Sequence, residues 1–276
     1  VFENSDEAGK LATLQLMSNR KMESQYNLVY NQMFTDNAVM KAEAAKTLKD
    51  VASTDNLDDL FNLLEQTDQE YVSAVQTAIN SVLSTMTQAD QMKVVAERMM
   101  STDKTHLYYS ALANSQSEQA KEALIGAYDG ETGINQKAAF DALKQWKTFD
   151  GVYPLLDIAR SSKDNNIVSE AVDAIIQKTA SSNQTGAVKY LYLREAMELA
   201  KTDAQKNTIL RLIGNTGLYQ AMLYVAPFMD NPALSESAAQ AAMNIGTNNP
   251  QYAGEETTKI LNKVSKTLNN PDAGYQ

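Results

Sequence analysis

The chain has 276 residues, of which only 11 are Gly and 5 are Pro, and this excludes collagen-like and Pro/Gly-rich disordered chains and disfavours a turn-dense all-β fold. With 24 Lys and Arg against 34 Asp and Glu, the net charge is −10, so nucleic acid and anionic membranes are not expected as partners. The chain contains no Cys, hence no disulfide or thiolate metal site, and its longest apolar run, 221–229, is too short to predict a membrane span.

Amphipathic segments of helical length follow one another along the whole chain, and no segment predicts a strand. One helix type recurs every 30 to 37 residues with small or aliphatic residues at positions i and i+4. These pairs are Ala44/Leu48, Ala74/Ala78, Leu107/Ala111, Ala139/Leu143, Ala171/Ile175, Thr208/Leu212 and Ala238/Ala242. Each interval has room for two helices and two turns. The sequence therefore predicts an all-α solenoid of about seven helical pairs, preceded by an extra N-terminal helix.

A second helix is expected between successive members of this series. The predicted ranges are 56–65, 88–100, 117–128, 152–161, 186–201 and 217–229. Capping-box patterns that begin at Thr67, Ser115 and Thr202 predict helix starts. Pro227 lies inside a predicted helix, so we expect a kink near the C-terminal end of that helix.

The two-helix units, with Ala-rich segments such as 41–48 and 138–143, resemble HEAT or HEAT-like (armadillo-type) repeats over about residues 20 to 268. HEAT units tend to carry an Asp in the turn before the second helix, and this position is matched by Asp36, Asp68, Asp103, Asp164, Asp203 and Asp230. The basic residue that the family places near the start of that helix is matched only at Lys41 and Lys104. The resemblance implies a right-handed α-α superhelix whose concave inner surface is the usual binding groove.

The Gln/Asn/Ser/Thr-rich, cysteine-free composition is also similar to the helical N-terminal regions of secreted Gram-negative bacterial proteins that end in a lectin-like keto-disaccharide hydrolase domain. This likeness implies a periplasmic or extracellular location and an attached downstream catalytic domain; a cytoplasmic location is the alternative. We expect residues 1–268 to form a single HEAT-like repeat domain and residues 269–276 to be a C-terminal tail or cut linker.

No residue pattern points to catalysis, a cofactor or a metal. His106 is the only His, and no Gly-x-Ser-x-Gly motif accompanies it, so a structural or surface role is expected. The acidic segment 55–59 lacks the Gly and the distal Glu of an EF-hand loop, and helix capping is the simpler interpretation. With 34 acidic residues, a pair of carboxylates at a hydrolytic spacing is expected by chance.

The residues two positions after each first member of the i/i+4 pairs should face away from the partner helices. These residues are Lys46, Gln76, Tyr109, Asp141, Asp173, Leu210 and Gln240. Tyr108 neighbours them, and tyrosines combine apolar area with a hydroxyl, as binding anchors often do. The candidate concave-face binding residues are therefore Lys46, Gln76, Tyr108, Tyr109, Asp141, Asp173 and Gln240.

These features favour a non-catalytic scaffold or binding module that presents a protein or carbohydrate partner, or positions an attached catalytic domain. The alternative is a carboxylate-based glycan hydrolase or its helical accessory domain, and an intracellular adaptor is a third possibility. An enzyme should have a deep pocket that holds two or more acidic groups, whereas a scaffold should have a shallow groove lined by polar and aromatic residues.

Overall fold

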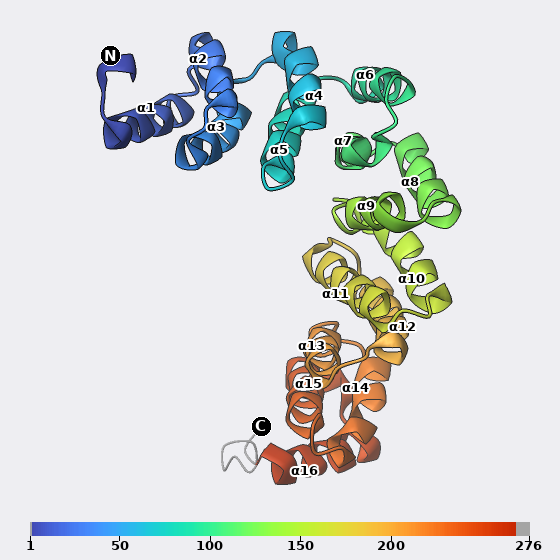
Figure 1. The fold of residues 1–276 in the computed structure, drawn as a ribbon. Helices are drawn as coiled ribbons and strands as arrows, with labels where there is room; N and C mark the ends of the chain where they lie inside the picture. The colour runs from blue at the N-terminus through green and yellow to red at the C-terminus, as the bar shows by residue number, and fades with distance from the viewer. Residues whose placement is uncertain (1, 269–276) are drawn as a thin grey trace. The chain divides into compact units, whose positions relative to one another are not determined.

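A computed structural model of the protein describes residues 2–268, and within that range every regular element is a helix (Figure 1). The predicted all-α class is therefore confirmed. The chain divides into two compact units, with unit 1 ending at Trp146 and unit 2 beginning at Lys147. The predicted tail at 269–276 lies outside the described residues.

Unit 1 holds the first nine α-helices and five short 3₁₀ helices. The α-helices are α1 Glu7–Asn19, α2 Tyr26–Asn31, α3 Ala38–Val51, α4 Leu57–Gln66, α5 Val72–Leu83, α6 Gln88–Met100, α7 Tyr109–Ser115, α8 Glu118–Gly130 and α9 Gly133–Lys144. The 3₁₀ helices are η1 Phe2–Asn4, η2 Glu23–Gln25, η3 Gln32–Phe34, η4 Thr54–Asn56 and η5 Thr105–Tyr108.

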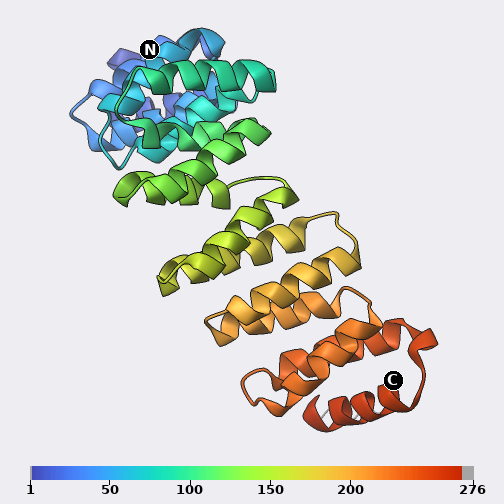
Figure 2. The same ribbon diagram turned by 90° about the vertical axis from the view of Figure 1, so that its right-hand side faces the viewer.

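Unit 2 holds the remaining helices, which Figures 1 and 2 show stacked one after another in chain order. The α-helices are α10 Val152–Ser161, α11 Asn165–Ser181, α12 Gly186–Leu199, α13 Asp203–Gly214, α14 Tyr219–Val225, α15 Ser235–Asn248 and α16 Glu255–Leu268. The 3₁₀ helices are η6 Phe149–Gly151, η7 Ala226–Asp230 and η8 Pro250–Tyr252.

Within each unit the helices pack as consecutive antiparallel pairs, and alternate helices also contact one another. In unit 1, α2 packs on α3, α4 on α5, α6 on α7 and α8 on α9, while α1, α3, α5, α7 and α9 form a continuous row. In unit 2, α10 packs on α11, α12 on α13 and α14 on α15, while α13 contacts both α11 and α15. Each pair buries the apolar stripe that neither helix covers alone.

The helix starts were predicted correctly at one capping box and wrongly at two. Thr202 caps α13 as expected, with the side chain of Gln205 completing the box. Thr67 instead ends α4, and a turn that closes between Tyr71 N–H and the Asp68 carbonyl delays α5 until Val72. Ser115 is the last residue of α7, so Ser117 caps α8 instead. Ser and Thr hydroxyls serve both ends of helices, and the motif alone does not distinguish them.

Near Pro227, where we predicted a kink, the helix changes from α to 3₁₀. The α-helix α14 ends at Val225, and the chain continues as the 3₁₀ helix η7 with Pro227 in its first turn. Pro227 has no N–H to donate to the carbonyl four residues earlier, which is why the α-helical ladder stops there.

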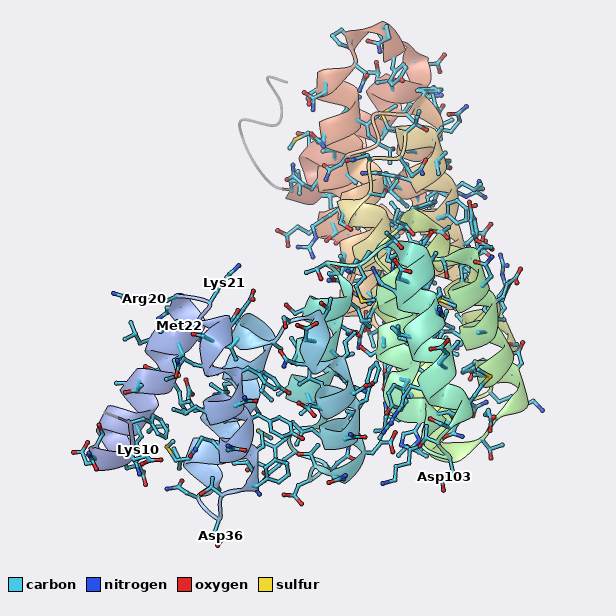
Figure 3. The ribbon with its side chains drawn as sticks, turned by 90° about the horizontal axis from the view of Figure 1, so that it is seen from above. Lys10, Arg20, Lys21, Met22, Asp36 and Asp103 are labelled. Atoms are coloured by element: carbon cyan, nitrogen blue, oxygen red, sulfur yellow. The ribbon has the colours of Figure 1, made fainter. Side chains whose placement is uncertain are left out.

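The Asp residues expected from the HEAT resemblance take several different roles. Asp68 pairs with Lys41 of the preceding helical pair at 3.5 Å, and the Asp164 carboxylate caps α11 by accepting from the N–H of Asn166 at 2.8 Å. Asp36 and Asp103 point outward from their turns instead (Figure 3). Only part of the predicted Asp series therefore contributes to contacts between helices.

In two helices the buried residues are shifted by one position from the predicted i/i+4 pairs. In α13 the buried pair is Ile209/Ile213, whereas Thr208 and Leu212 are half-buried; in α5, Val75 is fully buried and Ala74 is not. A larger aliphatic residue stands next to the predicted position in each case, and it gains more free energy from burial. This shift places Leu210 in the core of unit 2 rather than on the opposite surface.

The two units bury different kinds of residue. Unit 1 buries most of its rings, among them Phe61, Tyr108, Tyr128, Phe140 and Trp146. In unit 2 none of the rings of the described residues is buried, and the core consists of Ala, Val, Ile, Leu and Met side chains. The described aromatic residues of unit 2 therefore lie partly or fully at its surface.

Candidate binding cleft

A cleft of about 360 Å³ lies in unit 1 where α5, η5–α7 and α9 meet. Its apolar lining residues Val72, Leu107 and Ala142 are buried, and Ile134 is 61% exposed beside them. The remaining lining residues are Gln69, Gln76, His106, Ser110, Lys137, Ala138, Asp141 and Gln145. The cleft thus combines an apolar base with hydrogen-bonding groups of both polarities.

Hydrogen bonds between neighbouring elements hold the walls of the cleft in place. Gln76 Nε2 on α5 donates to the backbone carbonyl of Leu107 in η5 at 2.7 Å. One turn further along, Asn80 Nδ2 donates to Ser110 Oγ on α7 at 2.7 Å. These bonds fix α5 against η5 and α7. The walls are therefore formed by side chains whose positions are already determined without a ligand.

Asp141 is the only carboxylate that lines this cleft. Lys137 Nζ lies 3.0 Å from Asp141 Oδ2, and Lys144 Nζ lies 2.8 Å from Asp141 Oδ1. Burial alone would raise the pKa of Asp141, but the hydrogen bonds from Lys144 and Lys137 outweigh it and hold the pKa below its usual value. Asp141 is thus an ionised, paired group at neutral pH, suited to hold Lys137 in place rather than to transfer a proton.

His106 also lines the cleft and is half-buried there. Its pKa is lowered from 6.5 by burial and then by the nearby positive charge of Lys104, while a hydrogen bond with Asn135 acts in the opposite direction. The imidazole is therefore neutral at pH 7, with one nitrogen able to donate and the other able to accept.

A second cleft of unit 1, of about 440 Å³, lies between α4 and α6. Asp55, Asp58, Glu97 and Arg98 are among its lining residues. The guanidinium of Arg98 is already engaged, because Arg98 Nη2 lies 2.9 Å from Glu65 Oε1 and also donates to Asn62 Oδ1 at 3.0 Å. Among the described residues, no three His, Asp or Glu side chains are arranged to hold a metal ion.

Two of the predicted binding residues, Gln76 and Asp141, come together in the first cleft. Lys46 is exposed on α3 but does not line it. Asp173 on α11 and Gln240 on α15 are exposed in unit 2, and Asp173 Oδ1 accepts a hydrogen bond from Gln205 Nε2 at 2.8 Å. Of the predicted residues, only Gln76 and Asp141 line the same cleft.

Tyr108 and Tyr109 were expected at the surface, and this expectation is wrong: their exposed fractions are 0% and 4%. The chain enters α7 through the 3₁₀ helix η5, which has three residues per turn, so the α-helical phase used for the prediction does not apply. The Tyr108 ring packs edge-on against Phe61, and Tyr108 Oη donates to Glu65 Oε1 at 2.5 Å. Tyr108 is a core residue.

Three cleft residues that were not predicted lie one turn from a predicted one. Lys137 and Gln145 stand four residues before and after Asp141, and His106 stands three residues before Tyr109. Extending the predicted positions by one turn would have identified these three, whereas Ser110 directly follows Tyr109 and would not have been found.

No family model and no curated protein matches the chain. Among residues 2–268, no helix combines the length and the apolar character that crossing a bilayer requires.

Proposed function

We propose that the chain is a non-catalytic HEAT-like repeat module, a right-handed superhelical scaffold, whose cleft between α5, η5–α7 and α9 binds an extended segment of a protein partner. The carrying observation is the cleft itself, in which Gln69, Lys137 and Gln145 are exposed above buried apolar residues. Glutamine amides offer both a donor and an acceptor, which is what the backbone of an extended peptide requires.

The pairing of helices supports the repeat part of this proposal. Each pair contacts the next within its unit, and Lys41 links one pair to the turn of the following pair through Asp68 at 3.5 Å.

The state of the polar groups in the cleft supports a binding role. Asp141 is held by two lysines, so it is not poised for proton transfer.

The test is photo-crosslinking from the cleft. A photoreactive amino acid in place of Ile134, which is 61% exposed in the cleft, is compared with one in place of Val39, which is 53% exposed on α3 outside it. In extract of the native host, position 134 should crosslink one protein partner and position 39 should not. The purified partner should then bind Ile134→Ala/Lys137→Ala at least tenfold more weakly than the original chain.

The matched control is Val39→Ala/Lys49→Ala, which removes one exposed aliphatic residue and one exposed Lys from α3. It should bind the partner with unchanged affinity. Equal crosslinking from positions 39 and 134, or equal affinity of the two double variants, would refute the role of the cleft.

The carboxylate-based hydrolase remains the second candidate because three acidic residues, Asp55, Asp58 and Glu97, line the cleft between α4 and α6. It predicts turnover on a panel of glycans that is lost in Asp58→Asn and in Glu97→Gln, whereas the binding module predicts no turnover by any of the three proteins.

A further inference from the structure

Helices α10, α12 and α14 lie on the opposite side of unit 2 from α11, α13 and α15 (Figure 1). Six rings form two clusters on these helices and on the 3₁₀ helices η6 and η7: Phe149, Tyr153 and Tyr192, and Tyr190, Tyr224 and Phe228. Tyr153 is exposed and the other five rings are half-buried; because Tyr and Phe are enriched in binding interfaces, this side of unit 2 is a candidate interface.

Helix α12 joins the two clusters. Tyr192 contacts Tyr153 of α10 with the ring centroids 5.7 Å apart, and Tyr190 contacts Tyr224 of α14 with the centroids 5.9 Å apart. Since residues two apart on a helix point in nearly opposite directions, the stripe between the clusters faces outward. Leu191, Arg194 and Glu198 occupy this stripe, and Leu191 is 51% exposed. Leu223 of α14 is 38% exposed and lines a cleft of about 350 Å³ against α16.

Arg194 differs from Arg160, the arginine of the neighbouring helix α10. The Arg160 guanidinium is paired with Glu195 at 2.6 Å and Asp157 at 3.4 Å. The Arg194 guanidinium carbon instead lies over two rings, 5.5 Å from the Tyr190 centroid and 5.1 Å from the Tyr224 centroid, and it forms no ion pair with a described carboxylate. The two rings beside Arg194 cross at 80°, and a guanidinium with no ion pair to a described carboxylate can receive one in a two-pronged hydrogen bond.

The charges of the chain are divided unevenly. Residues 1–146 contain 12 Lys and Arg against 21 Asp and Glu, a net charge of −9, whereas residues 147–276 contain 12 against 13, a net charge of −1. Unit 2 therefore imposes little long-range repulsion on an acidic partner, and unit 1 carries nearly all the negative charge.

We propose that the face formed by Leu191, Arg194, Tyr190 and Tyr224 is a docking surface for an acidic, apolar peptide segment of a protein partner. Arg194 pairs with an Asp or Glu of that segment, while Leu191 covers an apolar side chain next to it. This surface lies in unit 2 and does not depend on the cleft of unit 1.

The test uses an array of random synthetic peptides probed with the whole labelled chain. Bound peptides should be enriched in Asp and Glu next to Leu, Ile or Phe. The tightest binder, measured in solution by fluorescence polarisation, should lose about tenfold or more in affinity when its acids are replaced by the matching amides, and by a similar factor in Arg194→Ala.

Arg160→Ala is the matched control: it removes an exposed arginine of α10 that is already paired within the chain. It should bind the selected peptide as the original chain does, and so should the cleft variant Ile134→Ala/Lys137→Ala. Arg194 is exposed, so Arg194→Ala should fold normally, which circular dichroism checks. Absence of acidic enrichment, equal losses in Arg194→Ala and Arg160→Ala, or Arg194-dependent binding to oligogalacturonate in place of peptides would overturn the proposal.

Discussion

Two buried tyrosines of unit 1 illustrate how differently a hydroxyl can contribute to stability. Tyr108 Oη donates to Glu65 Oε1 and receives a hydrogen bond from Arg98 Nε at 3.1 Å, so it links three side chains of α4, α6 and η5. Tyr26 Oη is buried without any hydrogen-bond partner in the described structure. Burial raises the pKa of both hydroxyls, so each is protonated at every ordinary pH.

The substitution Tyr→Phe should therefore act in opposite directions at the two positions. Tyr108→Phe leaves Glu65 and Arg98 with one partner fewer and should lower the free energy of unfolding by about 1–2 kcal/mol. Tyr26→Phe removes a buried polar atom that nothing satisfies, and it should be neutral or stabilising. Urea denaturation of the two variants measures the difference; equal destabilisation would mean that the Glu65–Arg98–Tyr108 cluster contributes nothing specific.

His106 should make stability depend on pH below about 6.5. Its folded-state pKa is lower than the value of 6.5 that it has when exposed, so the unfolded chain takes up a proton first as the pH falls. This contribution is complete above 6.5 and is lost progressively as the pH falls from 6.5 through the folded-state pKa. Denaturation midpoints at about pH 7.5 and pH 5 should differ less in His106→Gln than in the original chain. Identical pH dependences would show that His106 is not the group responsible.

At the scale of helices, the close approach of two helix backbones limits the size of the side chain that a position accepts. A Cβ on Gly214 at the end of α13 would lie 2.7 Å from Cα of Ala241 and 2.9 Å from its Cβ, both on α15. The Cα and Cβ atoms of Ala241 can move away only if α15 itself moves. Gly126 of α8 is also helical, yet a Cβ there would meet nothing within 4 Å.

Gly→Ala should consequently destabilise the chain at one position and stabilise it at the other. Gly214→Ala should cost about 1–3 kcal/mol through overpacking. Gly126→Ala should gain about 0.5–1 kcal/mol, since Ala loses less backbone freedom on entering a helix. Thermal unfolding followed by circular dichroism compares them, and a stabilised Gly214→Ala variant would mean that α13 and α15 are not packed as described.

The helical periodicity was predictable because apolar spacing and turn residues both report on it, and the second helices at 88–100 and 152–161 were located to the residue. The phase within each helix was less predictable. In α13, Thr208 and Ile209 differ by one position, and only packing against α15 selects Ile209 for the core. The candidate cleft was predicted through Gln76 and Asp141 alone, because the 3₁₀ helix η5 rotates Tyr108 and Tyr109 into the core.

At the scale of the whole molecule, the uneven charge distribution should make one unit more sensitive to salt than the other. Unit 1 carries a net charge of −9 and unit 2 a net charge of −1. Raising the ionic strength screens the repulsion within unit 1 and should increase its stability, with little change in unit 2.

Hydrogen exchange measured by mass spectrometry at about 20 mM and 300 mM salt tests this expectation. Protection of α3, α5 and α9 should rise with salt, while that of α11, α13 and α15 should stay nearly constant. A uniform rise in all six helices would mean that net charge per unit does not control the response.

Because unit 1 buries its rings, the intrinsic tryptophan fluorescence of this protein reports on the folding of that unit. Trp146 is the only tryptophan of the chain and is 2% exposed at the end of unit 1. Its fluorescence therefore senses the core of unit 1, whereas none of the tyrosines of unit 2 in the described range is buried. Melting curves recorded by tryptophan emission will follow unit 1, and the far-ultraviolet signal will follow the helices of both units, so a difference between the two curves would separate their unfolding without any label.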